Sequence, residues 1–171
     1  MAVAMVKGEE LKNALDRLLK AFSGYYNINL SSPAAPFAAE AVFSAHDEQY
    51  FLVKAARLTD YNTSEHVFFA LEDQLTAQRL AKLDLIAWET GILRADPGPK
   101  HRATDVGLCI LTGHLTDEAA ALIPKLKHSK SYRFGFYGYS QYRLVVYDLF
   151  SKRLVRNRMG DSLEKAIRNT L

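Results

Sequence analysis

Basic and aromatic side chains are interleaved between Lys125 and Arg158, and these residues have the most interpretable chemistry in the chain. Aromatic rings can stack on nucleic-acid bases, and Lys or Arg can neutralise phosphates, so this combination is typical of a surface for an anionic partner. That partner could be nucleic acid, a phosphate ligand or an acidic protein. The expected binding residues are Lys127, His128, Lys130, Tyr132, Arg133, Tyr137 and Arg143.

The distribution of charge supports the same interpretation. From residue 125 onward the chain has eleven Lys and Arg residues against three acids, a net charge of +8, so the first 124 residues carry −5 of the total of +3. Such an asymmetry favours an anionic partner. The alternative is that the late cations pair with the earlier acids or only keep the surface solvated.

The aromatic residues also have a structural alternative. In a regular strand from Ser131 to Gly138, alternate side chains point to opposite faces, and Tyr132, Phe134 and Phe136 share one of them. A row of this kind is more readily core than binding platform. We therefore expect Phe134 and Phe136 to be buried.

Residues that could support catalysis or bind a metal are scattered along the chain. The histidines outside the basic region show no H-x-H or H-E-x-x-H spacing, and Cys109 lies in an apolar segment that predicts a packed thiol. A phosphate-binding loop, a dinucleotide fingerprint and a G-x-S-x-G motif are all absent from the sequence. We expect no cofactor, no metal site and no catalytic residues, and the residues favour a binding protein over an enzyme.

Composition and length bound the class of protein. The 171 residues are most simply one domain, residues 1–171, and 49% hydrophobic content is ordinary for a globular protein. A single cysteine excludes an intramolecular disulfide and fits a reducing compartment. The first residues lack the charge order of a signal peptide, and no window reaches the roughly 20 apolar residues of a membrane helix. The expectation is a soluble, cytoplasmic protein without a membrane partner.

Hydrophobic periodicity predicts the elements that position the basic region. Period 3.6 indicates helices at 7–22 and about 73–90, a short one after Thr116, and a last one that Asp161 and Glu164 would cap. Alternation indicates strands at 37–45, 50–56, 66–71, 104–112, 131–138, 140–150 and 153–157. The predicted fold is a single α+β domain of order α-β-β-β-α-β-α-β-β-β-α, with a mixed or antiparallel sheet and helices largely on one face.

The order of the first elements resembles the core of the restriction-endonuclease-like nucleases. Their motif is an acid on one strand and (D/E)-x-K on the next, which together hold a metal ion that activates water. Glu40 could be the first acid and Asp47 or Glu48 the second, and Lys54 would then reach the site from a spacing other than that of the motif. The one literal (D/E)-x-K sequence, Glu10–Lys12, falls in the first predicted helix. The resemblance implies a degenerate phosphodiesterase as an alternative function. A third alternative is a homo-oligomeric structural or regulatory protein that uses the aromatic strands as an interface edge.

The segment from His128 to Gly138, followed by an Arg-bearing strand, resembles an uncharacterised bacterial domain family found mainly in clostridial-type genomes. The resemblance covers the C-terminal half best. It implies a small stand-alone domain and no catalytic residues.

Overall fold

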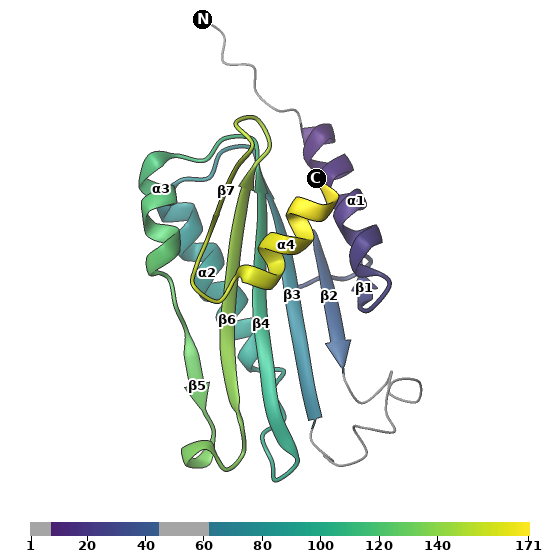
Figure 1. Cartoon of the computed structure of the whole chain (residues 1–171), viewed down its shortest axis with the longest axis vertical. Coiled ribbons are helices and arrows are strands. Elements are labelled where there is room, and N and C mark those ends of the chain that lie inside the picture. The colour runs from purple at the N-terminus through teal and green to yellow at the C-terminus, as the bar shows by residue number, and fades with distance from the viewer. Residues whose placement is uncertain (1–7, 45–61) are drawn as a thin grey trace, which may run out of the picture.

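A seven-stranded mixed sheet with helices on both faces is formed by residues 8–44 and 62–171, which the computed structural model describes (Figure 1). The helices in this part of the chain are α1 (Gly8–Phe22), α2 (Ala77–Ile92), α3 (Asp117–Leu122) and α4 (Asp161–Thr170). The strands are β1 (Asn27–Asn29), β2 (Ala39–Ser44), β3 (Asn62–Glu72), β4 (His101–Thr112), β5 (Ser129–Ser131), β6 (Tyr139–Asp148) and β7 (Arg153–Arg156). The α+β class and the mixed sheet are therefore as predicted.

The sheet has three parallel strands at its centre and antiparallel strands at its edges. Its order is β1-β2-β3-β4-β6-β5, in which β3, β4 and β6 are parallel. The outer edge of β6 is shared, because β5 pairs with its first residues and β7 with its last. Between them the Asn157 side chain accepts a hydrogen bond from Leu144 N and donates to the carbonyls of Tyr142 and Leu126. The side-chain amide of Asn157 therefore provides hydrogen bonds to β6 where neither β5 nor β7 pairs with it.

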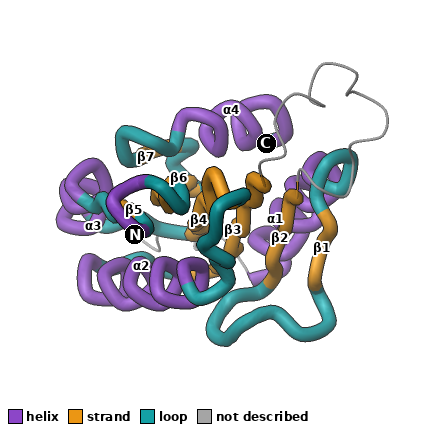
Figure 2. Tube along the Cα trace, turned by 90° about the horizontal axis from the view of Figure 1, so that it is seen from below, coloured by secondary structure: helices purple, strands orange, loops and turns teal. Residues whose placement is uncertain are grey.

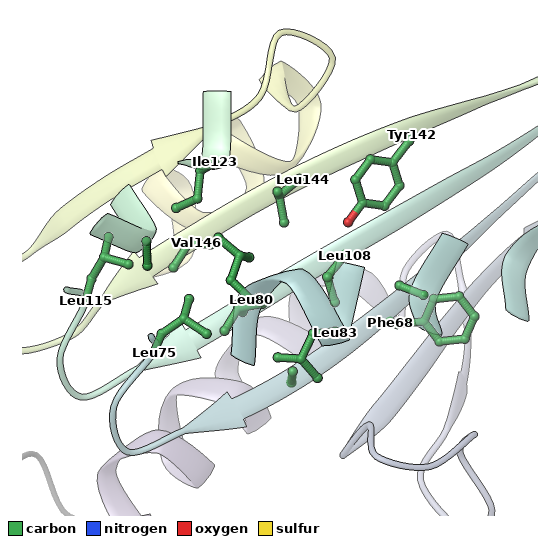
Figure 3. Close-up of a cluster of buried hydrophobic side chains, with 14 of the residues drawn as sticks. Phe68, Leu75, Leu80, Leu83, Leu108, Leu115, Ile123, Tyr142, Leu144 and Val146 are labelled. Atoms are coloured by element: carbon green, nitrogen blue, oxygen red, sulfur yellow. The ribbon is translucent and has the colours of Figure 1, made fainter. Parts of the chain in front are cut away.

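Each face of the sheet has its own apolar core. Leu80 and Leu83 of α2 pack with Leu108 and Leu144 on one face, together with α3 (Figure 3). On the other face α1 and α4 cover a second cluster that includes Cys109. Figure 2 shows α2 and α4 on opposite sides of the strands. The expectation that the helices lie largely on one face is wrong, because central parallel strands are apolar on both faces and need cover on both.

Some helix boundaries differ from the sequence prediction. The N-cap of α2 is Thr76, whose Oγ1 accepts a hydrogen bond from Arg79 N at 3.2 Å, and not Asp73. Thr116 caps α3 as predicted. At α4 the N-cap is Gly160, without a side-chain hydrogen bond, so the cap proposed for Asp161 and Glu164 is wrong. Those two acids bind basic side chains instead.

The predicted strand 131–138 is wrong. Strand β5 ends at Ser131, and a turn containing the 3₁₀ segment Arg133–Gly135 follows. The short strand β1 was not predicted, because its three polar-rich residues show no extended alternation. The predicted strand 50–56 and the turn before it lie outside the described residues.

Candidate functional site

A loop, Tyr132–Gly138, joins β5 to β6 at one end of the sheet, and we call it the tip loop (Figure 1). Four of its residues have left-handed backbone conformations: Arg133 (φ 47°), Phe134 (φ 54°), Gly135 (φ 90°) and Gly138 (φ 80°). Non-glycine residues rarely adopt this region, and each costs on the order of 1–3 kcal/mol that the surroundings must offset. The loop closes on itself through hydrogen bonds from Gly135 N and Tyr137 N to Tyr132 O.

This conformation turns two phenylalanine rings toward solvent. Phe134 is 97% exposed and Phe136 is 79% exposed. The expectation that both are core residues is wrong, because the segment does not follow the alternation of a strand. Surfaces rarely display adjacent apolar rings this openly without a binding role.

A buried histidine anchors the tip loop to β4. His101 Nδ1 lies 2.6 Å from Tyr137 O, and His101 Nε2 lies 2.8 Å from Thr104 Oγ1. Because a carbonyl only accepts, Nδ1 carries the proton, and in the neutral ring Nε2 accepts from the Thr104 hydroxyl. The Tyr132 ring packs edge-on against His101, and its hydroxyl bonds Ser140 Oγ at 2.9 Å. The loop is therefore fixed to both β4 and β6.

Four cations lie on the tip loop, on β5 or at the start of β4. The tip loop together with Lys100, Arg102 and Lys130 forms what we call the basic tip. Lys130 Nζ lies 5.4 Å from the centre of the Tyr132 ring, and the Arg133 guanidinium lies 4.9 Å from that of Tyr137, to whose hydroxyl it also donates. Within the described residues, none of these four cations has a carboxylate partner.

A pocket of about 250 Å³ opens between the tip loop and β4. We call it the ring pocket, because Phe136 and Tyr139 line it together with Arg102 and His101. Two aromatic rings and a guanidinium are the groups that hold a planar, electron-rich ligand, by stacking and by cation–π contact.

A family model with the description "Domain of unknown function (DUF8052)" matches residues 10–169. The chain belongs to this family. The match confirms the expected membership of a family without an assigned activity. No curated protein and no solved structure matches the chain. The basic tip lies inside the region that the DUF8052 model matches.

The structure brings four of the seven expected binding residues of this DUF8052 chain together: Lys130, Tyr132, Arg133 and Tyr137. Lys127 is exposed just before β5. His128 lies away from the loop, where its Nε2 contacts Asp84 Oδ2 of α2 at 2.7 Å and its ring stacks on Trp88. The site residues that the sequence did not single out are Lys100, His101, Arg102 and Tyr139, whereas Phe134 and Phe136 were singled out but assigned to the core.

Arg143 also lies apart from the basic tip. It projects toward the face that carries α1 and α4, where its guanidinium contacts Glu65 at 2.7 Å and Asp105 at 2.8 Å. Tyr26 donates a hydrogen bond to Glu65 from the same side. Burial raises the pKa of Asp105, and Arg143 opposes that shift. The guanidinium fills the place between the two carboxylates, so this cluster is an internal ion network.

The described part of the DUF8052 chain contains no metal site of the kind that the nuclease-like alternative requires. Glu40 accepts two hydrogen bonds from Arg94, at 2.8 and 3.0 Å, and one from Ala34 N at 2.6 Å. Burial acts to raise the pKa of Glu40, but these hydrogen bonds lower it overall. In residues 8–44 and 62–171 no three His, Cys, Asp or Glu side chains are arranged to hold a metal ion. Asp47, Glu48 and Lys54 lie outside those residues.

Two further expectations concern Cys109 and membranes. Cys109 is buried, and burial raises the pKa of its thiol to about 12, so it is a packed thiol as predicted. Among the described helices, none has the length and apolarity needed to cross a bilayer.

Proposed function

We propose that this DUF8052 protein is a binding module that holds single-stranded nucleic acid at its basic tip. The observation that carries the proposal is the pair of exposed rings, Phe134 and Phe136, on a hydrogen-bonded loop that has cations without carboxylate partners in the described chain on it and beside it. Stacking of a base on an aromatic ring contributes about 1–3 kcal/mol, and the cations neutralise neighbouring phosphates.

A single strand suits this surface better than a duplex or an acidic protein. Bases of a duplex are stacked on each other, so their faces cannot reach Phe134, Phe136 or the ring pocket. An acidic protein would account for the cations, but the carboxylates that would bind them offer no aromatic face to stack in a pocket lined by Phe136 and Tyr139. A free phosphate ligand would leave the rings without a role.

The hydrogen bonds that hold the backbone of the tip loop also favour binding. Ordering a flexible loop at an interface costs about 0.5–1.5 kcal/mol for each immobilised side chain. Here the His101 and Tyr132 contacts already hold the backbone that presents the rings.

The experiment is a titration of a fluorescent oligonucleotide of about 12 nucleotides, followed by anisotropy between about 50 and 200 mM salt. We expect the logarithm of the affinity to fall by about 0.7 for each phosphate contacted, per unit of the logarithm of salt. The double substitution Phe134→Ala/Phe136→Ala weakens binding roughly 10-fold or more. Arg102→Gln/Lys130→Gln reduces the salt dependence.

The β6–β7 turn provides a matched control at the opposite end of the sheet (Figure 1). It also carries an exposed ring and an exposed cation, Phe150 and Lys152. Phe150→Ala/Lys152→Gln should leave binding unchanged. Absence of salt-dependent binding, or equal losses in the two double variants, overturns the proposal. If polyglutamate binds as tightly as the oligonucleotide, the partner is an acidic protein.

In this proposal the module works in the cytoplasm of a bacterial cell. Its lone buried thiol suits a reducing compartment, and the segment from His128 to Gly138 resembles a bacterial domain family. Fractionation of cells that express the protein with a fluorescent label tests this location.

A further inference from the structure

A second pocket lies next to the ring pocket and differs from it in chemistry. It has a volume of about 220 Å³, and the described residues that line it all have polar side chains, among them Asn62, Ser64, Asp96 and Thr104. His101 lines both pockets. A strand with one base in the ring pocket therefore has its adjoining nucleotide within reach of this second pocket, which we call the hydroxyl pocket.

The hydroxyl pocket does not suit a phosphate. Arg94 lines it, but its guanidinium already donates two hydrogen bonds to Glu40, and the Asp96 carboxylate lies in the same lining. Arg94, Glu40 and Asp96 together carry a charge of −1, in contrast to the basic tip. A neutral group that forms hydrogen bonds therefore suits this pocket better than a phosphate does.

A chain of hydrogen bonds determines which kind of group is preferred. His101 Nδ1 donates to Tyr137 O, so His101 Nε2 accepts from Thr104. Thr104 has no second proton, and Ser64 Oγ in turn donates to Thr104 Oγ1 at 3.3 Å. The Ser64 proton is thus committed, and its oxygen is left with lone pairs that accept from a ligand hydroxyl.

We propose that the nucleic acid is RNA, and that Ser64 accepts a hydrogen bond from a ribose 2′-hydroxyl in the hydroxyl pocket. This inference rests on the proposed function. A hydroxyl donor extends the Ser64–Thr104–His101 chain, and hydrogen bonds in such a chain strengthen one another. Deoxyribose has no 2′-hydroxyl, and this group is what allows a protein to distinguish RNA from DNA at a given site.

The test compares three oligomers of equal length and the same uracil bases: ribose, deoxyribose and 2′-O-methyl ribose. The ribose oligomer should bind about 5- to 10-fold more tightly than the deoxyribose oligomer. The 2′-O-methyl oligomer retains the oxygen but cannot donate, and it should bind no better than the deoxyribose oligomer.

Ser64→Ala removes the acceptor from the pocket. It should lower the affinity for the ribose oligomer to that for the deoxyribose oligomer and leave the latter unchanged. Ser151→Ala, an exposed serine on the β6–β7 turn, is the control and should preserve the difference. A thermal melt of each variant verifies that the fold is retained.

The outcomes separate this inference from the proposed function. Equal affinity for ribose and deoxyribose oligomers overturns the RNA assignment and leaves nucleic-acid binding intact. A Ser64→Ala variant that loses affinity for both oligomers alike also overturns it. If no oligomer binds at low salt, the proposed function and this inference both fall.

Discussion

Gly135 and Gly138 both have left-handed backbone conformations, but their surroundings differ. A Cβ at Gly138 would lie 2.4 Å from Arg102 O, whereas at Gly135 the nearest atom would be Ser131 Oγ at 3.8 Å. We expect Gly138→Ala to lower the free energy of unfolding by about 3 kcal/mol and Gly135→Ala by only about 1 kcal/mol. Urea denaturation measures both. Equal losses would show that the carbonyl of Arg102 does not constrain the loop.

His66 predicts a pH dependence of stability. Burial first, and then the nearby Arg94, lower its pKa to about 4, whereas an unfolded histidine has a pKa of about 6.5. The unfolded state therefore takes up a proton that the folded state rejects, and stability is lost as pH falls from about 6.5 to 4. Between pH 7 and pH 5 this loss is at most about 2 kcal/mol, because the ring is partly exposed.

The matched variant for that prediction is His66→Gln, which cannot titrate. Urea midpoints at pH 7 and pH 5 should differ less in His66→Gln than in the parent protein. The same pH dependence in both proteins would assign the effect to other groups.

For single residues, the sequence predicted which side chains are chemically relevant better than it predicted whether they are exposed or buried. Lys130 and Arg133 are solvent-exposed cations as their composition suggested. The exposure of Phe134 and Phe136 was not predictable, because two consecutive left-handed residues, Arg133 and Phe134, have no sequence signature. The role of His101 could not be predicted from the sequence either, since its partner Tyr137 is 36 positions away in the chain.

The contact between α2 and β4 depends on a glycine inside the helix. Gly91 is buried, and a Cβ there would lie 2.4 and 2.5 Å from the two γ-carbons of Val106. An exposed helical Gly→Ala change usually stabilises by about 1 kcal/mol, but Gly91→Ala should destabilise by about 2 kcal/mol through overpacking. Thermal or urea unfolding measures the change.

Val106→Ala removes the methyl groups that would clash. In that background Gly91→Ala should cost nothing or stabilise the protein, although Val106→Ala alone destabilises it. Purely additive effects of the two substitutions would contradict the role assigned to this contact.

Elements with strong periodicity were predictable from the sequence. The helix predicted at 7–22 is α1, and its buried residues recur at the helical spacing on which that prediction rests: Leu11, Ala14, Leu15, Leu18, Leu19 and Phe22. The two-sided cover of the sheet was not predicted, because residues 104–112 were assigned an alternating pattern, although Val106–Leu111 contains no polar side chain. Strand β5 was not predictable from the sequence, since only its pairing with the first residues of β6 defines its three polar residues as a strand.

For the whole molecule, folding removes much of the charge asymmetry seen in the sequence. Arg143 pairs with two acids of the earlier part of the chain, and Arg153 pairs with Asp117. Arg156, Lys165 and Arg168 pair with Asp161 and Glu164 of α4, acids that the excess of +8 already includes, so these three cations lie at α4 and not at the tip loop. The excess of +8 therefore does not form one patch, and the basic tip is a smaller feature than the sequence suggested.

The ion pairs of this protein should contribute unequally to its free energy of unfolding, with the Arg143 network contributing most. Arg143→Met leaves Glu65 and Asp105 close together and mostly buried, so we expect a loss of about 3 kcal/mol at neutral pH in urea denaturation. Arg153→Met breaks an exposed pair and should change stability by less than about 0.5 kcal/mol. Similar effects of the two substitutions would indicate that Arg143 does not compensate the two carboxylates.

The end of α4 lies in the upper half of the molecule and the tip loop at its lower end (Figure 1). A surface tether or a fused reporter attached after Leu171 would therefore project away from the exposed rings. Immobilised protein should bind its ligand as well as protein free in solution does.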